Sequence, residues 1–180
     1  TCRQALALGL DVSLSVDAND FDLQRDGLAR ALLDPAVMSA LQPIAGTHIE
    51  LLIYEWSGQY DQRIIVDWTR IDGPETIIAL ANTVRTSPQM ARTGRTALGA
   101  SMLYGTDLLN QRAQCAKRTL DISGDGVNNN GTPPEEVRSY VARQGVTVNG
   151  LVIGFKPGEV FFGEADVVTL TRYFSENVIT

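Results

Sequence analysis

Apolar runs alternate with longer stretches of helical period along the whole chain. The short apolar runs predict strands over residues 5–12, 48–56, 118–123 and 146–153. Residues 57–60 are short enough for a hairpin loop, so residues 62–68 should pair antiparallel with 48–56. Helices are expected from about residue 20 and over 35–41, 72–85, 96–111, 133–144 and 166–177. This order predicts an α/β fold with one mostly parallel central sheet, one antiparallel edge strand and helices on both faces.

Composition and net charge limit which classes of protein the chain can belong to. The chain has 180 residues, 44% of them apolar, without a repeat, low-complexity tract or linker, so we expect a single domain over residues 1–180. The net charge of −6 argues against nucleic acid or an anionic lipid surface as the main partner. No apolar run approaches the ~20 residues of a membrane span, so membrane insertion is not expected. The sequence does not indicate an oligomeric state.

One carboxylate and two hydroxyls follow the first expected strand. The segment Asp11-Val-Ser13-Leu-Ser15 places them at spacing i, i+2 and i+4, where a buried strand becomes a loop. Two later segments carry further oxygen donors: Thr96 in a glycine turn before a helix, and Asp125 after a late strand. The carboxyl ends of parallel strands share one edge of a sheet, so these segments should converge there.

The expected donors are all oxygen atoms, which suits Mg²⁺, Ca²⁺ or Mn²⁺ better than zinc. The chain has one histidine, which excludes a zinc site built from several histidines. Taken one at a time, these motifs have more than one interpretation. Thr96 can instead cap the helix that it begins, and Thr93 competes with it as the hydroxyl donor. The stretch 128–130 resembles an oxygen-rich calcium loop, but an ordinary Asn-rich turn is the better interpretation.

The three segments, in this order, resemble the metal-ion-dependent adhesion site (MIDAS) of von Willebrand factor type A (vWA) domains. Segments 55–58, 66–69, 123–131 and 146–151 are similar to a bacterial secreted subfamily without an assigned function. The resemblance implies a Rossmann-like vWA fold and a divalent cation, Mg²⁺ first and Mn²⁺ or Ca²⁺ as alternatives. Its ligands, direct or through water, are then Asp11, Ser13, Ser15, Thr96 and Asp125.

The family also implies a partner: an acidic side chain of another protein fills an open coordination position on the cation. Trp56, Gln59 and Tyr60 are expected at the hairpin tip near this edge, where they can form a contact rim, although Trp56 can equally pack in the core. Such domains usually continue with a further strand and a terminal helix, whereas this sequence ends at Thr180, which leaves one sheet edge undecided.

Acidic residues at the start of the first expected helix have two interpretations. They can hold a second cation, but acids at a helix start more often cap it and interact with its dipole. Asp17 and Asn19 are the candidate N-caps, and the other two acidic residues are Asp20 and Asp22.

The positions of the two cysteines indicate the cellular compartment in which the protein is located. Cys2 lies nine residues before Asp11, and Cys115 lies ten before Asp125. If those aspartates end adjacent parallel strands, both cysteines lie at the opposite ends, close enough for a disulfide, although two buried free thiols are the alternative. A disulfide implies an oxidising compartment, secreted or periplasmic. The chain begins at Thr1 without an initiator methionine, which fits a removed leader or a boundary chosen for expression.

Three functions compete: a protein-binding module without catalysis, a metal-dependent hydrolase or phosphatase, and a domain whose metal only stabilises it. A phosphatase of the haloacid dehalogenase type needs Asp-x-Asp, but the second acid is replaced by Ser13. A Ser-His-Asp hydrolase needs His48, which should begin its strand at the edge opposite Asp11. No nucleophile elbow and no phosphate-binding P-loop occur. The binding module is the preferred hypothesis.

Overall fold

The computed structural model describes residues 1–13, 18–88, 94–154 and 165–180. The strands are β1 (Cys2–Asp11), β2 (His48–Trp56), β3 (Gln62–Arg70), β4 (Arg118–Gly124) and β5 (Thr147–Val152). The helices are α1 (Ala18–Leu32), α2 (Pro35–Leu41), α3 (Pro74–Thr86), α4 (Leu98–Asn110), α5 (Pro134–Arg143) and α6 (Val167–Asn177). The predicted elements are all present, and β1 begins three residues earlier than expected.

The sheet has the strand order β3-β2-β1-β4-β5. β1 pairs in parallel with β2 and β4, and β4 pairs in parallel with β5. β3 pairs antiparallel with β2 at one edge, as predicted. The register sets Asp11 opposite Trp56, the last residue of β2, so the carboxyl ends of these two strands lie at the same edge.

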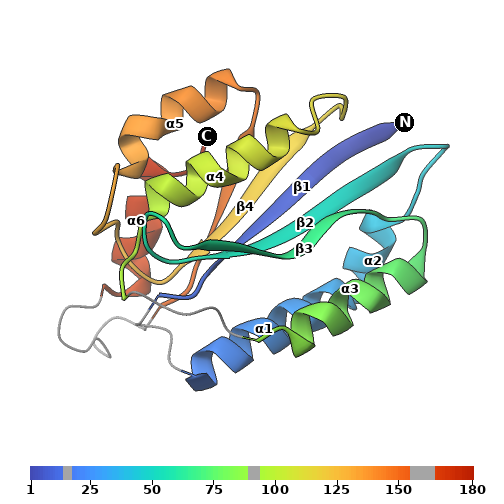
Figure 1. Ribbon diagram of the computed structural model, residues 1–180, viewed down its shortest axis with the longest axis horizontal. Coiled ribbons are helices and arrows are strands. Elements are labelled where there is room, and N and C mark those ends of the chain that lie inside the picture. Colours follow the sequence, from blue (N-terminus) through green and yellow to red (C-terminus); the bar gives the residue numbers. More distant parts are fainter. Residues whose placement is uncertain (14–17, 89–93, 155–164) are drawn as a thin grey trace.

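Helices pack on both faces of the sheet (Figure 1): α4, α5 and α6 on one, and α1, α2 and α3 on the other. β2 explains why both faces are needed, because its alternate side chains enter different cores. Leu52 and Tyr54 pack in the core under α4 and α5, whereas Leu51 and Ile53 pack in the core next to α1 and α3. A strand that is apolar on both faces is typical of a central parallel sheet, and it confirms the predicted α/β fold.

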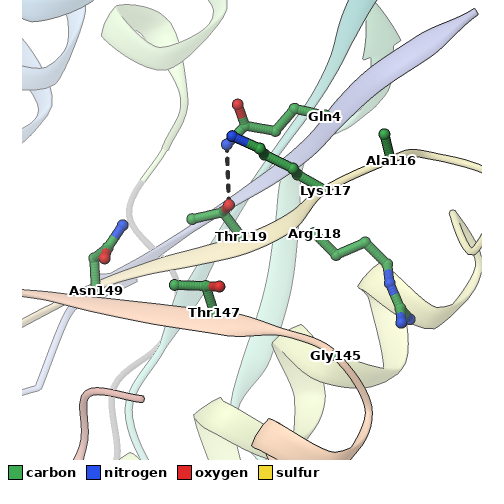
Figure 2. A pocket seen from close by; sticks show the side chains of 8 residues that line it. All are labelled: Gln4, Ala116, Lys117, Arg118, Thr119, Gly145, Thr147 and Asn149. Carbon is green, nitrogen blue, oxygen red and sulfur yellow. Dashed lines mark hydrogen bonds between the residues drawn. The ribbon is translucent and has the colours of Figure 1, made fainter.

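The sheet is more open near β5, which is the edge strand opposite β3 in the described sheet. Thr147 and Asn149 are exposed, and Leu151 is 64% exposed. A hollow of about 500 Å³ lies near the amino ends of β4 and β5, and Figure 2 shows polar side chains around it. Gln4 Nε2 donates a hydrogen bond to Thr119 Oγ1 there at 2.9 Å. This hollow is remote from the carboxyl edge of the sheet, where Asp11 lies.

The length and apolarity of each helix show whether it could span a membrane. Within the described residues, no helix combines the length and apolarity needed to cross a bilayer.

Candidate metal-binding site

Asp11 is the last residue of β1, and its side chain is completely buried. Its Oδ1 accepts a hydrogen bond from the backbone N–H of Ser13 at 2.8 Å, which fixes the turn after the strand. Its Oδ2 accepts one from the backbone N–H of Asp125 at 3.4 Å. The backbone N–H of Asp11 in turn donates to Ser123 Oγ at 3.3 Å. One carboxylate therefore links the loop after β1 to the turn after β4.

The hydroxyl of Ser13 connects the same two segments. Ser13 Oγ lies 3.4 Å from Asp125 Oδ1 and donates a hydrogen bond to it. Ser13 is buried, whereas Asp125 is half-buried. The structure thus brings Asp11, Ser13 and Asp125 together, although 114 residues separate the two carboxylates. Ser15 lies outside the described residues, as does Thr93, the competing hydroxyl donor.

Thr96 joins this group through the turn that follows β4. Its backbone N–H donates to Asn129 Oδ1 at 2.8 Å, and its carbonyl accepts from Asn129 N–H at 2.9 Å. A Cβ placed on Gly126 would lie 4.0 Å from Thr96 Oγ1, so the buried threonine hydroxyl faces the backbone next to Asp125.

The alternative role of Thr96 as a helix cap is wrong. α4 begins two residues later, at Leu98, and its N-cap is Ala97, which has no side-chain acceptor. Asn128 supplies the missing acceptor from a distant loop: its Oδ1 accepts from Leu98 N–H at 2.8 Å and from Gly99 N–H at 3.4 Å. The Thr96 hydroxyl is therefore not needed as a cap.

Three consecutive asparagines hold the loops of this edge together. Asn128 caps α4, Asn129 pairs with Thr96, and Asn130 Oδ1 accepts from Gln59 N–H at 2.9 Å. Their side-chain oxygens all bind backbone N–H groups, which agrees with the turn interpretation and not with a calcium loop. These positioning roles were missed in the sequence, where the only signal was an Asn run that begins three residues after Asp125.

Gly99 is required at the start of α4 by a close backbone approach. A Cβ at this position would lie 2.1 Å from the carbonyl oxygen of Thr132, far inside van der Waals contact. The helix that follows Thr96 therefore packs directly on the loop that carries the asparagines.

The electrostatics of the two aspartates favour a cation. Burial, and secondly the nearby Asp125 carboxylate, raise the pKa of Asp11 to about 7, while its hydrogen bonds to Ser13 and to the Asp125 N–H act in the opposite direction. A buried carboxyl beside a second carboxyl is stabilised by a proton or by a positive ion. Two carboxylates and neutral hydroxyls are donors that fit a hard divalent cation.

A family model described as "Protein of unknown function (DUF1194)" matches residues 1–180. The chain belongs to this family. Its fold is that of a vWA-like domain, as solved structures also indicate. The comparison with curated protein sequences gave no match.

The DUF1194 chain is similar in structure to several vWA-containing proteins. Proximal thread matrix protein 1 from the mussel byssus has TM-score 0.66 and 13% identity, covering 84% of this chain and 38% of that one. A von Willebrand factor type A protein from Catenulispora acidiphila has TM-score 0.60 and 14% identity, with coverages of 84% and 33%. The pilus adhesin SpaC from Lactobacillus rhamnosus GG has TM-score 0.60 and 13% identity, with 83% and 24%.

The DUF1194 chain thus spans well under half the length of these proteins, and the similarity establishes the fold. One structure of the mussel protein is described as having a zinc-occupied MIDAS motif. That description places a cation at the corresponding type of site in a protein of the same fold.

The β2–β3 hairpin tip borders the site of the DUF1194 domain. A hollow of about 310 Å³ is lined by residues of the tip and of the two neighbouring loops, namely Gln59, Tyr60, Asp61, Arg95 and Asn130. Tyr60 is 87% exposed, so it can contact another molecule. Of the two interpretations of Trp56, core packing is confirmed and the contact rim is wrong, because the side chain is completely buried in the core between sheet and helices.

The acidic residues of α1 behave as ordinary helix residues where they are described. Asp22 Oδ1 pairs with Arg25 at 2.7 Å and is exposed to solvent. Asp17 and the side chains of Asn19 and Asp20 lie outside the described residues. α1 already includes Asn19, so the prediction that Asn19 is the N-cap is wrong. The capping role of Asp17 and the second-cation interpretation stay predictions.

The opposite end of the sheet carries the predicted disulfide. Cys2 and Cys115 are bonded, with their Cα atoms 4.7 Å apart. His48 begins β2 at this end and not near Asp11, as predicted, and its Nε2 lies 3.3 Å from Glu50 Oε1. Neither His48 nor the cysteines can therefore take part in chemistry at the Asp11 edge.

Proposed function

We propose that this vWA-like domain is a metal-ion-dependent protein-binding module of the adhesion type. Asp11, Ser13, Ser15, Thr96 and Asp125 would hold a divalent cation, Mg²⁺ first, directly or through water. When bound, the cation supplies an open coordination position that attracts an acidic side chain of a partner protein. The observation that supports this most is the convergence of Asp11, Ser13 and Asp125 at one edge of the sheet.

The rest of the chain contributes position and contact surface. The asparagine loop holds Thr96 and the hairpin tip in fixed places relative to Asp125. Tyr60 and Arg95 are both exposed beside the site, so they are the side chains that we expect to touch the partner around the coordinating carboxylate. An exposed aromatic ring and an arginine are frequent anchors of protein interfaces.

Binding is favoured over catalysis for two reasons. His48 lies at the opposite end of the sheet, and Ser13 occupies the place of the second acid that a phosphatase of the haloacid dehalogenase type needs. The similar structures include a pilus adhesin and a byssus matrix protein, which favours an adhesion-type role. The Cys2–Cys115 disulfide supports a secreted or periplasmic location.

Metal binding is tested by thermal unfolding. Mg²⁺ or Mn²⁺ at about 100 times its Kd should stabilise the fold by roughly 2.7 kcal/mol and raise Tm by about 5–10 °C, and chelation should reverse the gain. Asp11→Asn keeps the shape of the side chain but removes its charge, so it should abolish the shift. Asp107→Asn, on the exposed face of α4, is the matched control and should retain it. A full shift in Asp11→Asn would remove the basis of the proposal.

Partner binding needs a separate experiment. The immobilised domain should capture an extracytoplasmic protein with Mg²⁺ and release it on chelation, and Tyr60→Ala and Arg95→Ala should weaken capture without changing the Mg²⁺ shift. Metal-dependent turnover of phosphate or acyl esters, lost in Asp11→Asn, would instead favour a hydrolase. A metal shift with neither capture nor turnover would favour a purely stabilising ion.

A further inference from the structure

A second group of ligand-type side chains lies at the amino end of the sheet, remote from Asp11. Cys2 of β1 is in register with His48 of β2, and Glu50 follows two residues later on the same strand. The Cys2 sulfur, a ring nitrogen of His48 and a carboxylate oxygen of Glu50 all lie within 4.8 Å of one another. Cys115 contributes a second sulfur through the disulfide. The four side chains thus form one cluster of two sulfurs, one imidazole and one carboxylate.

The spacing of this cluster fits a tetrahedral zinc ion. Ligands held at the usual 2.0–2.2 Å zinc bonds lie about 3.4 Å apart across a tetrahedral ion. His48 Nε2 and Glu50 Oε1 are 3.3 Å apart. In the disulfide the sulfurs are bonded to each other and are poor ligands. In the reduced protein, rotation about Cα–Cβ can separate them to the roughly 3.8 Å that two zinc-bound thiolates need.

Arg112 supplies the charge and the orientation that such a site requires. Its Nε lies 2.7 Å from Glu50 Oε2, the oxygen that does not face His48. Its guanidinium also stacks on Trp68, 5.0 Å from the ring centre. Two thiolates and one carboxylate exceed the charge of Zn²⁺ by one, and Arg112 balances the excess. Ligating carboxylates are commonly held in this way by a neighbouring group.

The cysteines and the histidine of this cluster are buried, unlike polar groups that gather by chance on a protein surface. Both cysteines are buried, and His48 is only 9% exposed. The Nδ1 atom of His48 is buried and has no hydrogen-bond partner among the described residues. The imidazole is therefore held in place by Glu50 without a full set of structural hydrogen bonds.

We propose that the reduced domain binds zinc through Cys2, Cys115, His48 and Glu50, and that the zinc site and the disulfide are alternative states. A dithiol reductant transfers two electrons and two protons to the Cys2–Cys115 bond and itself becomes a disulfide. Zn²⁺ then replaces the two thiol protons. In the reverse direction an oxidised dithiol takes the two electrons, the sulfurs bond again and Zn²⁺ is released. Formation of the disulfide would therefore expel the ion.

Cobalt is the probe that separates this site from the Asp11 site. Co²⁺ bound by thiolates gives a near-ultraviolet charge-transfer band, whereas an all-oxygen site gives none. In the Asp11→Asn variant reduced with a phosphine, we expect this band together with the visible spectrum of tetrahedral cobalt, and its loss on adding one equivalent of Zn²⁺. The oxidised protein should show no band. The result is independent of metal binding at Asp11.

Two variants and one control test the ligand set. His48→Ala and Glu50→Gln should each weaken Co²⁺ and Zn²⁺ binding at least tenfold, whereas Glu75→Gln, in the first turn of α3, should not. A folded reduced protein without the band would overturn the proposal, as would a band that neither variant weakens. If reduction alone unfolds the chain, zinc must restore the native far-ultraviolet circular dichroism spectrum, and failure to do so also overturns it.

Discussion

The two ends of β1 position their functional groups by different means. At the amino end, Cys2 and His48 are neighbours in the parallel ladder, and a covalent bond ties Cys2 to Cys115. At the carboxyl end, Asp11 is the last strand residue, and its companions lie on loops. Those loops are held by hydrogen bonds that backbone N–H groups donate to the side-chain oxygens of Asn128 and Asn129.

This difference separates stability from binding. Groups fixed by strand register and a cross-link stay in place without a ligand, whereas loop groups can adjust when an ion or a partner arrives. We therefore expect changes at the amino end to alter global stability and changes at the carboxyl end to alter affinity. Each of the following variants tests the expectation for one of the two ends.

The largest effect on stability is expected from the disulfide. The bond links residues 113 positions apart, and removing a native disulfide typically costs 2–5 kcal/mol. The double variant Cys2→Ser, Cys115→Ser should therefore lower Tm by roughly 5–15 °C. The Mg²⁺-induced shift should persist below the new Tm, because the Asp11 site lies at the other end of the sheet. Loss of that shift in a folded double variant would show that the two ends are coupled.

A smaller effect on stability, but a larger one on the site, is expected from Asn128→Ala. The change leaves the N–H groups of Leu98 and Gly99 without their acceptor, which should cost about 1 kcal/mol, as for other helix caps. Thr96 immediately precedes this helix start, so Mn²⁺ affinity should fall several-fold in calorimetric titration. Asn130→Ala, which frees only the hairpin tip, should leave Mn²⁺ affinity nearly unchanged. Equal losses in both variants would contradict the role given to Asn128.

The fold could be predicted because its signals are repeated along the chain. β2 has four consecutive apolar residues at its centre, Leu51-Leu52-Ile53-Tyr54, so both faces of the strand need to be covered by helices. The parallel order then fixed which strand ends meet, so the Cys2–Cys115 pairing and the remote place of His48 followed from topology. These predictions depended on which edge of the sheet each residue occupies and not on any side-chain detail.

The parts that could not be predicted depend on tertiary partners of single side chains. Asn128 caps a helix that begins 30 residues earlier in the chain, so no local pattern identifies it. Trp56 follows the strand alternation into the core, but a hairpin-tip tryptophan can also face solvent, and packing under α4 decides between them. For the same reason the sequence left helix capping open as an alternative role of Thr96, which the start of α4 at Leu98 excludes.

The smallest expected effect is a pH dependence that belongs to the carboxyl end alone. The pKa of Asp11 is raised from 3.8 to about 7, first by burial and then by Asp125. The folded protein thus holds this proton more tightly than the unfolded chain, so the contribution to stability is complete below about pH 4 and is lost as pH rises through about 7. A cation competes with the same proton. The Mg²⁺-induced rise in Tm should accordingly grow between about pH 5 and 7 and level off above it.

The difference in Tm between the wild-type domain and the Asp11→Asn variant, measured at each pH, isolates the contribution of Asp11 from those of other titrating groups. Without metal, wild-type Tm should fall by a few degrees relative to the variant between pH 5 and 8. Asp121→Asn is the matched control, since burial also raises the pKa of Asp121, but its carboxylate accepts from Asn149 and lies away from the site. That control should alter the metal-free pH profile and leave the Mg²⁺ increment unchanged. A Mg²⁺ increment that is flat from pH 5 to 8 in the wild-type domain would mean that the ion does not displace the Asp11 proton, and the ligand role of that carboxylate would have to be abandoned.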